Sequence, residues 1–384
     1  MSEFNPKTEI SIEGDKFLVN GTPTNEATTF RGVSMEGLMM NSRMANAVFD
    51  DDNEFTRHLW AYTDNEKWDA DRNTNELVEM LPTYKSKGLS CIDVNLQGAS
   101  PLGYYKSSPE GLSDLMTRIR AKFPDATEPE IWAGLPGTRS QPWNSGAFTE
   151  NGDLKPAFMA RAAKIIEAAD EIGMIVCLGL FYFGQDERIS DEKSVKTAVE
   201  EATNWVLAKG YTNVLLEINN ECDVPLYEHE ILCPDRVHEL VELAKSISKD
   251  GARLLVSTSF TRRMVPTEKV IESSDFILLH GNGMHDPVEI TNRVQETRNA
   301  NSYKGQPIFF NEDDHFEFEN ESNNFVAALE QRAGWGFFDP GSGAGGTAAY
   351  GNYVDGYQNP PINWTINTPR KESFFWILSK LTGR

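Results

Sequence analysis

Leu-Leu-Glu-Ile-Asn-Asn-Glu at residues 215–221 and Pro-Ile-Phe-Phe-Asn-Glu at residues 307–312 share one pattern, an apolar run of strand length that ends abruptly in a carboxylate. Asn, Asp and Glu are poor residues for the interior of a strand, so these acids are expected where each strand leaves the core. Glu221 and Glu312 are 91 residues apart, which leaves room for three compact strand–helix units. The pattern predicts two carboxylates at the C-terminal mouth of a (β/α)₈ barrel.

Similar strand-like runs recur along the chain with helical stretches between them, an alternation typical of a parallel sheet. Eight strands are predicted, at Thr28–Ser34, Ser90–Leu96, Met174–Phe181, Asn213–Ile218, Leu254–Ser259, Phe276–His280, Ile308–Asn311 and Gly334–Phe338. Helices are predicted at Asn75–Lys87, Ala157–Ile172, Lys193–Lys209, Asp235–Lys249, Thr267–Ser273, Val288–Ala300, Asn323–Arg332 and Lys371–Leu381. The predicted fold class is therefore α/β, a (β/α)₈ TIM barrel.

Three further segments complete this prediction. Ile10–Pro23 alternates in polarity and contains Asn20-Gly21, which predicts a β-hairpin that closes the barrel floor. The connections from Gln97 to about Lys155 and from Asp339 to Pro369 are too long for plain barrel loops. Both follow predicted strand C-termini, the face on which barrel enzymes build their sites. We expect a single catalytic domain over residues 1–384.

The charge balance narrows the choice of partner. The chain has 36 basic and 58 acidic residues, a net charge of −22, which disfavours nucleic acid and anionic membranes. A neutral or weakly charged ligand is more compatible with this negative net charge. No apolar stretch approaches the length of a membrane-spanning helix, so a soluble protein is expected. Cytoplasmic, secreted and periplasmic locations stay open, as does the oligomeric state.

The four cysteines are not spaced as metal ligands. Cys91 and Cys177 fall inside predicted strands, where they are expected to be small buried hydrophobes. Cys222 and Cys233 flank a loop after the strand that ends near Glu221. The sequence leaves open whether these two form a disulfide.

Two carboxylates that meet at a barrel mouth suit the cleavage of a glycosidic bond with retention. One carboxylic acid protonates the leaving oxygen while a second carboxylate attacks the anomeric carbon, so the two need different pKa values. Glu221 suits the acid role because Asn220 beside it can bind the hydroxyl next to the reacting carbon. Glu312 is assigned as nucleophile by elimination. The alternative, two solvent-exposed loop carboxylates, would be preferred for either acid alone, but the pair argues against it.

These residues resemble a known group of enzymes. Asn220-Glu221 after strand four and Glu312 after strand seven look like the paired signature of clan A glycoside hydrolases, which include family 5 cellulases and mannanases. Glu217, four residues before Glu221, is also similar to the strand-four pattern of that clan. The resemblance implies a retaining β-glycoside hydrolase that acts on an oligo- or polysaccharide by double displacement.

The resemblance extends to the N-terminal region but has two departures. Val19-Asn20-Gly21 followed by Phe30–Ser34 is similar to the opening hairpin and first strand of the clan. Cys222 stands where a proline usually follows the strand-four Glu, and Asp313-Asp314-His315 replaces a short aromatic or glycine turn. The exact family and the sugar specificity are therefore not assigned.

The clan resemblance also suggests roles for two ring side chains. His280 ends strand six, where the clan often holds an aromatic residue or a His that contacts the nucleophile. A purely structural role for a lone His is an equal alternative. Trp335 lies in strand eight, where the clan often has a Trp platform for the sugar. Its alternative is a core Trp beneath the barrel mouth.

Further sugar contacts are predicted from position alone. Polar groups at strand exits are Asn95, Gln97, Tyr182 and Gln185, with Glu36 a weaker candidate. Trp143, together with Trp132 and Trp364, lies in the long connections on the same face. These tryptophans either stack on sugar rings or pin the long loops to the barrel.

The acidic run 312–319 admits a metal site, but its spacing matches no EF-hand loop and the chain has no HExxH. We expect no metal and no cofactor, with a carbohydrate as the partner. Two rival functions stay open: a non-catalytic carbohydrate-binding barrel, and a metal-dependent hydrolase that uses the cluster at Glu312–His315.

Overall fold

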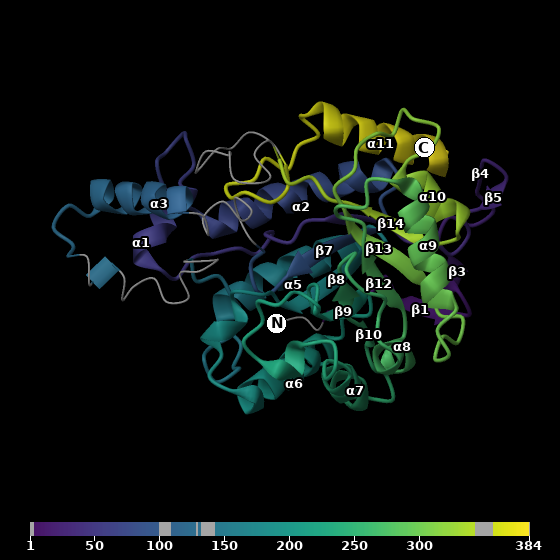
Figure 1. The fold of residues 1–384 in the computed structure, drawn as a ribbon, viewed down its shortest axis with the longest axis horizontal. Helices are drawn as coiled ribbons and strands as arrows, with labels where there is room; N and C mark the ends of the chain where they lie inside the picture. The colour runs from purple at the N-terminus through teal and green to yellow at the C-terminus, as the bar shows by residue number, and fades with distance from the viewer. Residues whose placement is uncertain (1–3, 100–108, 128–129, 132–142, 342–355, 384) are drawn as a thin grey trace.

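The computed structural model describes residues 4–99, 109–127, 130–131, 143–341 and 356–383. Its largest element is a parallel sheet with the strand order β10-β9-β8-β7-β6-β14-β13-β12-β11 (Figure 1). The strands are β6 (Met40–Arg43), β7 (Cys91–Asn95), β8 (Ile175–Phe181), β9 (Val214–Asn219), β10 (Leu255–Ser257), β11 (Ser259–Phe260), β12 (Ile277–His280), β13 (Ile308–Asp313) and β14 (Gly334–Phe337). Only Thr258 separates β10 from β11, so the two ends of this order are pieces of one strand position. The sheet is therefore an eight-position barrel.

Helices lie between successive strands and cover the outside of the barrel (Figure 1). They are α2 (Ala70–Ser86), α5 (Pro156–Glu171), α6 (Glu192–Lys209), α7 (His238–Ser246), α8 (Glu268–Ser273), α9 (Pro287–Arg298), α10 (Asn324–Glu330) and α11 (Pro369–Thr382). Local sequence sets their ends. Helix α9 begins with a capping box of Asp286 and Glu289 around Pro287, and α6 ends at the left-handed Gly210.

The predicted hairpin closes the floor of the barrel. Strands β1 (Ile10–Glu13), β2 (Lys16–Val19) and β3 (Thr22–Pro23) form an antiparallel sheet, with Asn20-Gly21 as the turn between the last two. Phe17 packs edge-on against Phe276 and Phe309 at 5.8 and 5.7 Å between ring centroids. The N-terminal segment is thereby fixed to the lowest layer of the barrel core.

The predicted first strand was wrong. Within Thr28–Ser34, β4 (Thr29–Phe30) and β5 (Val33–Ser34) form a separate hairpin, because Arg31 and Gly32 adopt positive φ values of 50° and 81° and turn the chain. The first barrel strand is β6 (Met40–Arg43), which pairs with β14 and β7.

Part of the structure lies to one side of the barrel (Figure 1). It contains α1 (Glu54–Arg57), the 3₁₀ turn η1 (His58–Trp60) and α3 (Pro109–Lys122). Its small core is separate from the main one and consists of Phe49, Leu59, Trp60, Leu115, Ile119, Ile131 and Trp143. Two further 3₁₀ turns, η3 (Asp186–Arg188) and η4 (Glu230–Leu232), follow β8 and β9. Within the described residues, no helix has both the length and the apolar character needed to cross a membrane.

The cysteines carry no disulfide. Cys91 and Cys177 are buried in β7 and β8, as expected, and Cys222 and Cys233 are both free thiols. The loop after β9 is held by other contacts, such as the hydrogen bond from Cys222 N–H to the Ser259 carbonyl at 3.0 Å.

Candidate active site

The barrel interior changes from apolar to polar on the way from floor to mouth. Met39, directly before β6, belongs to the apolar floor, whereas Asn41 and Arg43 in β6 lie one and two inward positions higher. The other strands follow this layering, with apolar residues at the floor (Cys91, Cys177, Leu215, Leu278, Phe309) and polar ones above (Asp93, Asn95, Glu217, His280, Asn311). The site is therefore built on rigid strand ends.

A bulge in β13 turns Glu312 toward the mouth. Strict alternation would send Glu312 outward, as it does Phe310, which packs in the outer core. The pairing shifts by one residue against β12, so that Leu279 faces Phe310 but His280 faces Glu312. The register against β14 shifts in the same region. The extra residue in β13 turns the Glu312 side chain toward the barrel interior. Bulges commonly reorient a side chain in this way.

Glu221 reaches the mouth through an unusual backbone conformation. It follows the last residue of β9 by two positions and has a positive φ of 50°. Its backbone N–H donates to Ser259 Oγ at 2.8 Å, which holds this conformation in place. The side chain is 8% exposed, so it lies near the surface of the mouth but is largely enclosed.

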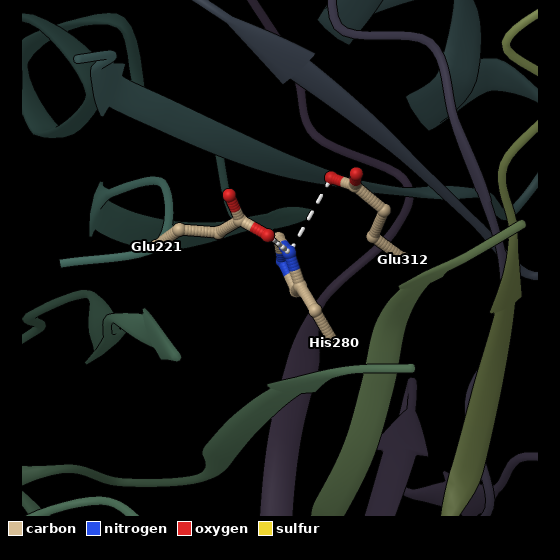
Figure 2. A group of neighbouring side chains, drawn as sticks. All are labelled: Glu221, His280 and Glu312. Atoms are coloured by element: carbon tan, nitrogen blue, oxygen red, sulfur yellow. Dashed lines mark hydrogen bonds and ion pairs between the residues drawn. The ribbon is translucent and has the colours of Figure 1, made fainter. Parts of the chain in front are cut away.

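The two acids meet across His280 (Figure 2). Nδ1 of His280 lies 2.9 Å from Glu221 Oε1 and 3.5 Å from Glu312 Oε2. One oxygen of each acid and a ring nitrogen of the His all lie within 4.8 Å of one another. The sequence predicted that the two carboxylates meet at the barrel mouth, and the structure places them side by side there.

The surroundings raise the pKa values of Glu221 and His280 for different reasons. Burial raises the pKa of Glu221, and the nearby Glu312 carboxylate adds to this, although His280 lowers it. Burial alone would lower the pKa of His280, but Glu312 and Glu221 together raise it to about 9. The pKa values of both groups are therefore raised, that of Glu221 chiefly by its burial and that of His280 by the two neighbouring acids.

Arg43, which sequence reasoning missed, holds Glu312. Its Nε pairs with Glu312 Oε2, its Nη2 donates to Asn220 Oδ1 at 2.5 Å, and its Nη1 lies 3.7 Å from Asp93 Oδ2. Burial tends to lower the pKa of Arg43, but Glu312 and the other neighbouring carboxyls raise it above its ordinary value. Correct placement of the first strand would have revealed this residue, because Arg43 is the last residue of β6.

Asn282 is a second contact that the sequence did not indicate. It follows β12 by two residues, and its Nδ2 donates to Glu312 Oε1 at 2.6 Å. Each oxygen of Glu312 therefore has its own donor, Asn282 on one and Arg43 on the other. Two such donors stabilise the ionised form of a carboxylate and fix its direction.

Asn220, predicted to bind a sugar hydroxyl, directly precedes Glu221 in the chain and is buried. Its Oδ1 accepts from Arg43. Its Nδ2 is buried and, within the described part of the chain, has no hydrogen-bond acceptor. That amide group is a donor left over for a ligand at the mouth.

Four predicted sugar contacts lie inside the protein. Gln97 Oε1 accepts from the backbone N–H of Tyr182 at 2.9 Å, and Gln185 Nε2 donates to the Trp143 carbonyl at 3.1 Å. Tyr182 packs against Phe183, with 4.3 Å between ring centroids. Asn95 is 1% exposed and lies in the polar layer below the mouth. Tyr182, at 6% exposed, keeps the most accessible surface of the four.

The structure does not bring the predicted aromatic platforms to the acid pair. Trp335 is fully buried among Phe318, Phe325 and Phe374, and its Nε1 donates to Asp313 Oδ2 at 3.0 Å. This is the core position given as its alternative. The inward positions on either side of it are Gly334 and Gly336, where an added Cβ would meet neighbouring backbone at 2.5 and 2.7 Å.

The loop tryptophans and Glu36 also lie away from the acids. Trp143 packs edge-on against Trp60 at 5.6 Å in the side core, and Trp364 Nε1 donates to the Asn73 carbonyl at 2.8 Å. Trp132 falls outside the described residues. Glu36 pairs with Lys16 at 2.6 Å.

Two groups of described residues have ligand atoms close enough for a metal ion. One is Glu221, His280 and Glu312, and the other is Asp313, Asp314 and His315. The first group already contains a cation, since Arg43 pairs with Glu312 and would repel a metal ion there. In the second, Asp313 accepts from His315 Nδ1 at 2.5 Å and from Trp335. In each group, at least one carboxylate oxygen therefore already has a partner within the protein.

No protein-family model matches the sequence, and no curated protein does. The fold is similar to that of solved glycoside hydrolases. A beta-glycosidase, BGL167, is 12% identical over 90% of this chain and 96% of its own length, with a TM-score of 0.53. An exo-beta-1,4-mannosidase from Opitutaceae bacterium strain TAV5 is 13% identical over 93% of this chain and 61% of its own, with a TM-score of 0.51. An endo-1,4-beta-mannanase from Rhizomucor miehei is 11% identical over 86% and 89%, with a TM-score of 0.50. At such low identity the likeness concerns the fold.

Proposed function

We propose that this barrel is a retaining β-glycoside hydrolase, with Glu221 as acid/base and Glu312 as nucleophile. The observation that carries the proposal is the approach of the two carboxyls within 4.8 Å at the mouth of a (β/α)₈ barrel. Retaining enzymes have their two carboxyl groups about 5–5.5 Å apart, whereas inverting enzymes leave about 6.5–9.5 Å for a water molecule.

The environment of each acid supports its role. Glu312 receives donors on both oxygens, from Arg43 and Asn282, which fix the direction of its carboxyl group. Burial and the Glu312 charge raise the pKa of Glu221, which favours the protonated acid. A raised pKa on one carboxyl of such a pair is what the role of general acid requires.

The reaction then runs in two balanced steps. In the first, a Glu312 oxygen forms a bond to the anomeric carbon, the bond from that carbon to the leaving oxygen breaks, and Glu221 gives its proton to the leaving oxygen. In the second, Glu221 takes a proton from water, whose oxygen displaces Glu312. His280 faces both acids throughout, and its positive charge stabilises the carboxylate that each step leaves behind.

The substrate class is proposed more broadly, as an oligo- or polysaccharide. Similar folds occur in proteins named as a beta-mannanase and a beta-mannosidase, so β-mannosides and β-glucosides are the first compounds to test. Asn220 Nδ2 has no acceptor among the described residues, so this donor is available to bind the sugar hydroxyl beside the reacting carbon.

A pair of variants tests the roles on an aryl glycoside panel. Glu312→Gln should lose turnover on every substrate, because the bond to the anomeric carbon cannot form. Glu221→Gln should lose turnover on substrates with poor leaving groups but retain the first step with activated aryl groups, which need little protonation. Glu317→Gln, at an exposed position five residues beyond Glu312, serves as the matched control and should keep full activity. Equal loss of the first step in both active-site variants would contradict the assignment.

A metal-dependent hydrolase is the second candidate, supported by the two groups of potential ligands. A chelator separates the two functions. Activity that survives prolonged treatment with EDTA supports the glycosidase mechanism. Activity that disappears and returns with added divalent metal supports the metal enzyme.

A further inference from the structure

The turn that carries Glu221 is held from the side by the next strand position of the barrel. The parallel pairing between β9 and β10 ends with Glu217 opposite Ser257. Thr258 then interrupts the strand, and β11 continues in a ladder with β12 on the other side. Beyond Ser257, hydroxyl side chains and single backbone bonds therefore take over the connection to the chain that follows β9.

Ser259 contacts the turn with two of its atoms. Its Oγ accepts from the backbone N–H of Glu221 at 2.8 Å, and its carbonyl accepts from the backbone N–H of Cys222 at 3.0 Å. Ser259 has 0% of its surface exposed, so water does not compete for either bond. A proline at position 222 would have no N–H to donate. The cysteine, which departs from the clan pattern, thus permits the second bond.

Two flanking pairs of side chains hold the ends of the same turn. Before Glu221, Thr258 Oγ1 donates to Asn219 Oδ1 at 2.7 Å. After it, the backbone N–H and Oγ1 of Thr261 donate to the two carboxylate oxygens of Asp223, at 2.8 and 2.6 Å. One short segment therefore binds the turn directly at Glu221 and on both sides of it.

The backbone of Glu221 needs this support. Its φ of 50° lies in the left-handed region, which is unfavourable for a residue with a Cβ and persists only where the surroundings impose it. In this conformation the side chain reaches His280, with Oε1 2.9 Å from Nδ1 (Figure 2). Without the Ser259 hydroxyl, the Glu221 N–H would lose its acceptor in a buried place. The turn would then gain by relaxing to a negative φ, which moves the carboxyl away from His280.

We propose that residues 258–261 form a clamp on the turn of the acid/base and that Ser259 is its main positioning residue. The inference rests on the proposed function, in which Glu221 protonates the leaving oxygen. Ser259 acts through the backbone of Glu221 rather than on the substrate. It keeps the carboxyl beside His280 and across from Glu312. An acid that is out of place transfers its proton poorly, and this matters most for leaving groups that need protonation.

The test compares Ser259→Ala with Ser257→Ala on aryl glycosides whose leaving groups range from activated to poor. Ser257 is the matched control, because it lies in the same strand position, is 1% exposed, and its Oγ has no hydrogen-bond partner within the described residues. Ser259→Ala should lower kcat/KM about tenfold or more with poor leaving groups but less than about threefold with activated ones, as part of the rate supplied by the general acid is lost. Ser257→Ala should match wild type across the series.

Crystal structures of the same variants give a readout that does not depend on activity. In Ser259→Ala the backbone of Glu221 should leave the left-handed region and its carboxyl should move away from His280. Ser257→Ala should keep the 2.9 Å contact. Thr261→Val, which removes the hydroxyl contact to Asp223, is a milder variant and should show the same changes to a smaller extent. It takes the place of Ser259→Ala if that protein does not fold.

The clamp is overturned if Ser259→Ala keeps both the positive φ of Glu221 and its contact with His280. It is also overturned if kcat/KM falls by the same factor for all leaving groups, or falls as far in Ser257→Ala. Glu221→Gln, measured on the same series, separates this result from a failure of the proposed function. If Glu221→Gln depends on the leaving group and Ser259→Ala does not, the clamp alone is wrong. If Glu221→Gln shows no such dependence, Glu221 is not the acid and both proposals fall.

Discussion

Replacement of Arg43 by Met should destabilise the protein strongly, because it removes a buried cation that contacts both Glu312 and Asp93 and leaves only His280 beside Glu312 among the described cations. The Arg43 side chain is 2% exposed and the Glu312 side chain 9%, so solvent cannot replace the lost partner. Removal of one member of a buried ion pair costs about 3–5 kcal/mol. At roughly 2 °C per kcal/mol, the lower end for large domains, the melting temperature should fall by roughly 6–10 °C.

The size of this effect should depend on pH in a defined direction. The carboxylates left without Arg43 can escape the penalty by taking up a proton, which is easier at low pH. The loss in melting temperature should therefore be smaller at pH 5 than at pH 8. Arg118→Met is the matched control, since Arg118 is 42% exposed and pairs with Asp114 on the surface of α3. Its effect should stay below about 0.5 kcal/mol.

Circular dichroism melts of wild type and both variants at the two pH values provide the measurement. Arg43→Lys adds a check on activity, because it keeps the charge but cannot reach Glu312, Asp93 and Asn220 at once. It should keep more stability than Arg43→Met and still lose kcat. An Arg43→Met protein that melts within 2 °C of the Arg118→Met control at pH 8 would refute the reasoning about this buried cation.

Four further outcomes are expected. Glu312→Ala should abolish turnover on every substrate, whereas Glu221→Ala should retain a fast first step on activated aryl glycosides, which stopped-flow release of the aryl group would measure. Trp143→Ala should lower the melting temperature by several degrees and leave KM unchanged, because this ring is buried in the side core. A several-fold rise in KM would instead indicate that the ring stacks on a sugar. His280 has its pKa raised to about 9, so its contribution to stability is complete below pH 6.5 and is lost as pH rises through 9. Unfolding midpoints measured from pH 6 to 10 should show this loss in wild type and not in His280→Gln. EDTA should leave activity intact.

The sequence predicted the fold correctly where a local pattern of residues determines the structure. Apolar runs that end in acids predicted β9 and β13, and strand–helix alternation predicted a parallel barrel. Glu221 and Glu312 lie together because the C-terminal ends of parallel strands meet at one face. These conclusions need only the strand period and the position of each acid in its strand.

The errors come from the barrel mouth, where the interior is polar. Met39 and the four residues of β6 read Met-Met-Asn-Ser-Arg. Their inward positions pass from apolar to charged, so they lack the alternation that marks a half-buried strand. The first strand was predicted at Thr28–Ser34 instead, so Arg43 was not among the predicted site residues. A local rule fails here because a functional site overrides it.

Side-chain direction was the other source of error. The bulge at Asn311–Glu312 depends on pairing with two neighbouring strands, which one sequence cannot show. Trp335 was expected at the mouth, although the pattern Gly334-Trp335-Gly336 indicates that its side chain points away from the barrel interior. Where two glycines occupy alternate positions, the barrel interior has no room for side chains, and the residue between them points outward.

The most direct test of the proposed mechanism is to trap its covalent intermediate. Wild-type protein is incubated with activated 2-deoxy-2-fluoro-β-glycosides of mannose and glucose, which form the glycosyl-enzyme quickly but hydrolyse slowly. The intact mass and the masses of proteolytic peptides are then measured. The account predicts one added sugar, located on Glu312, and no label in Glu312→Gln. A label on any other residue, or turnover of a substrate to the anomer of inverted configuration, would contradict it.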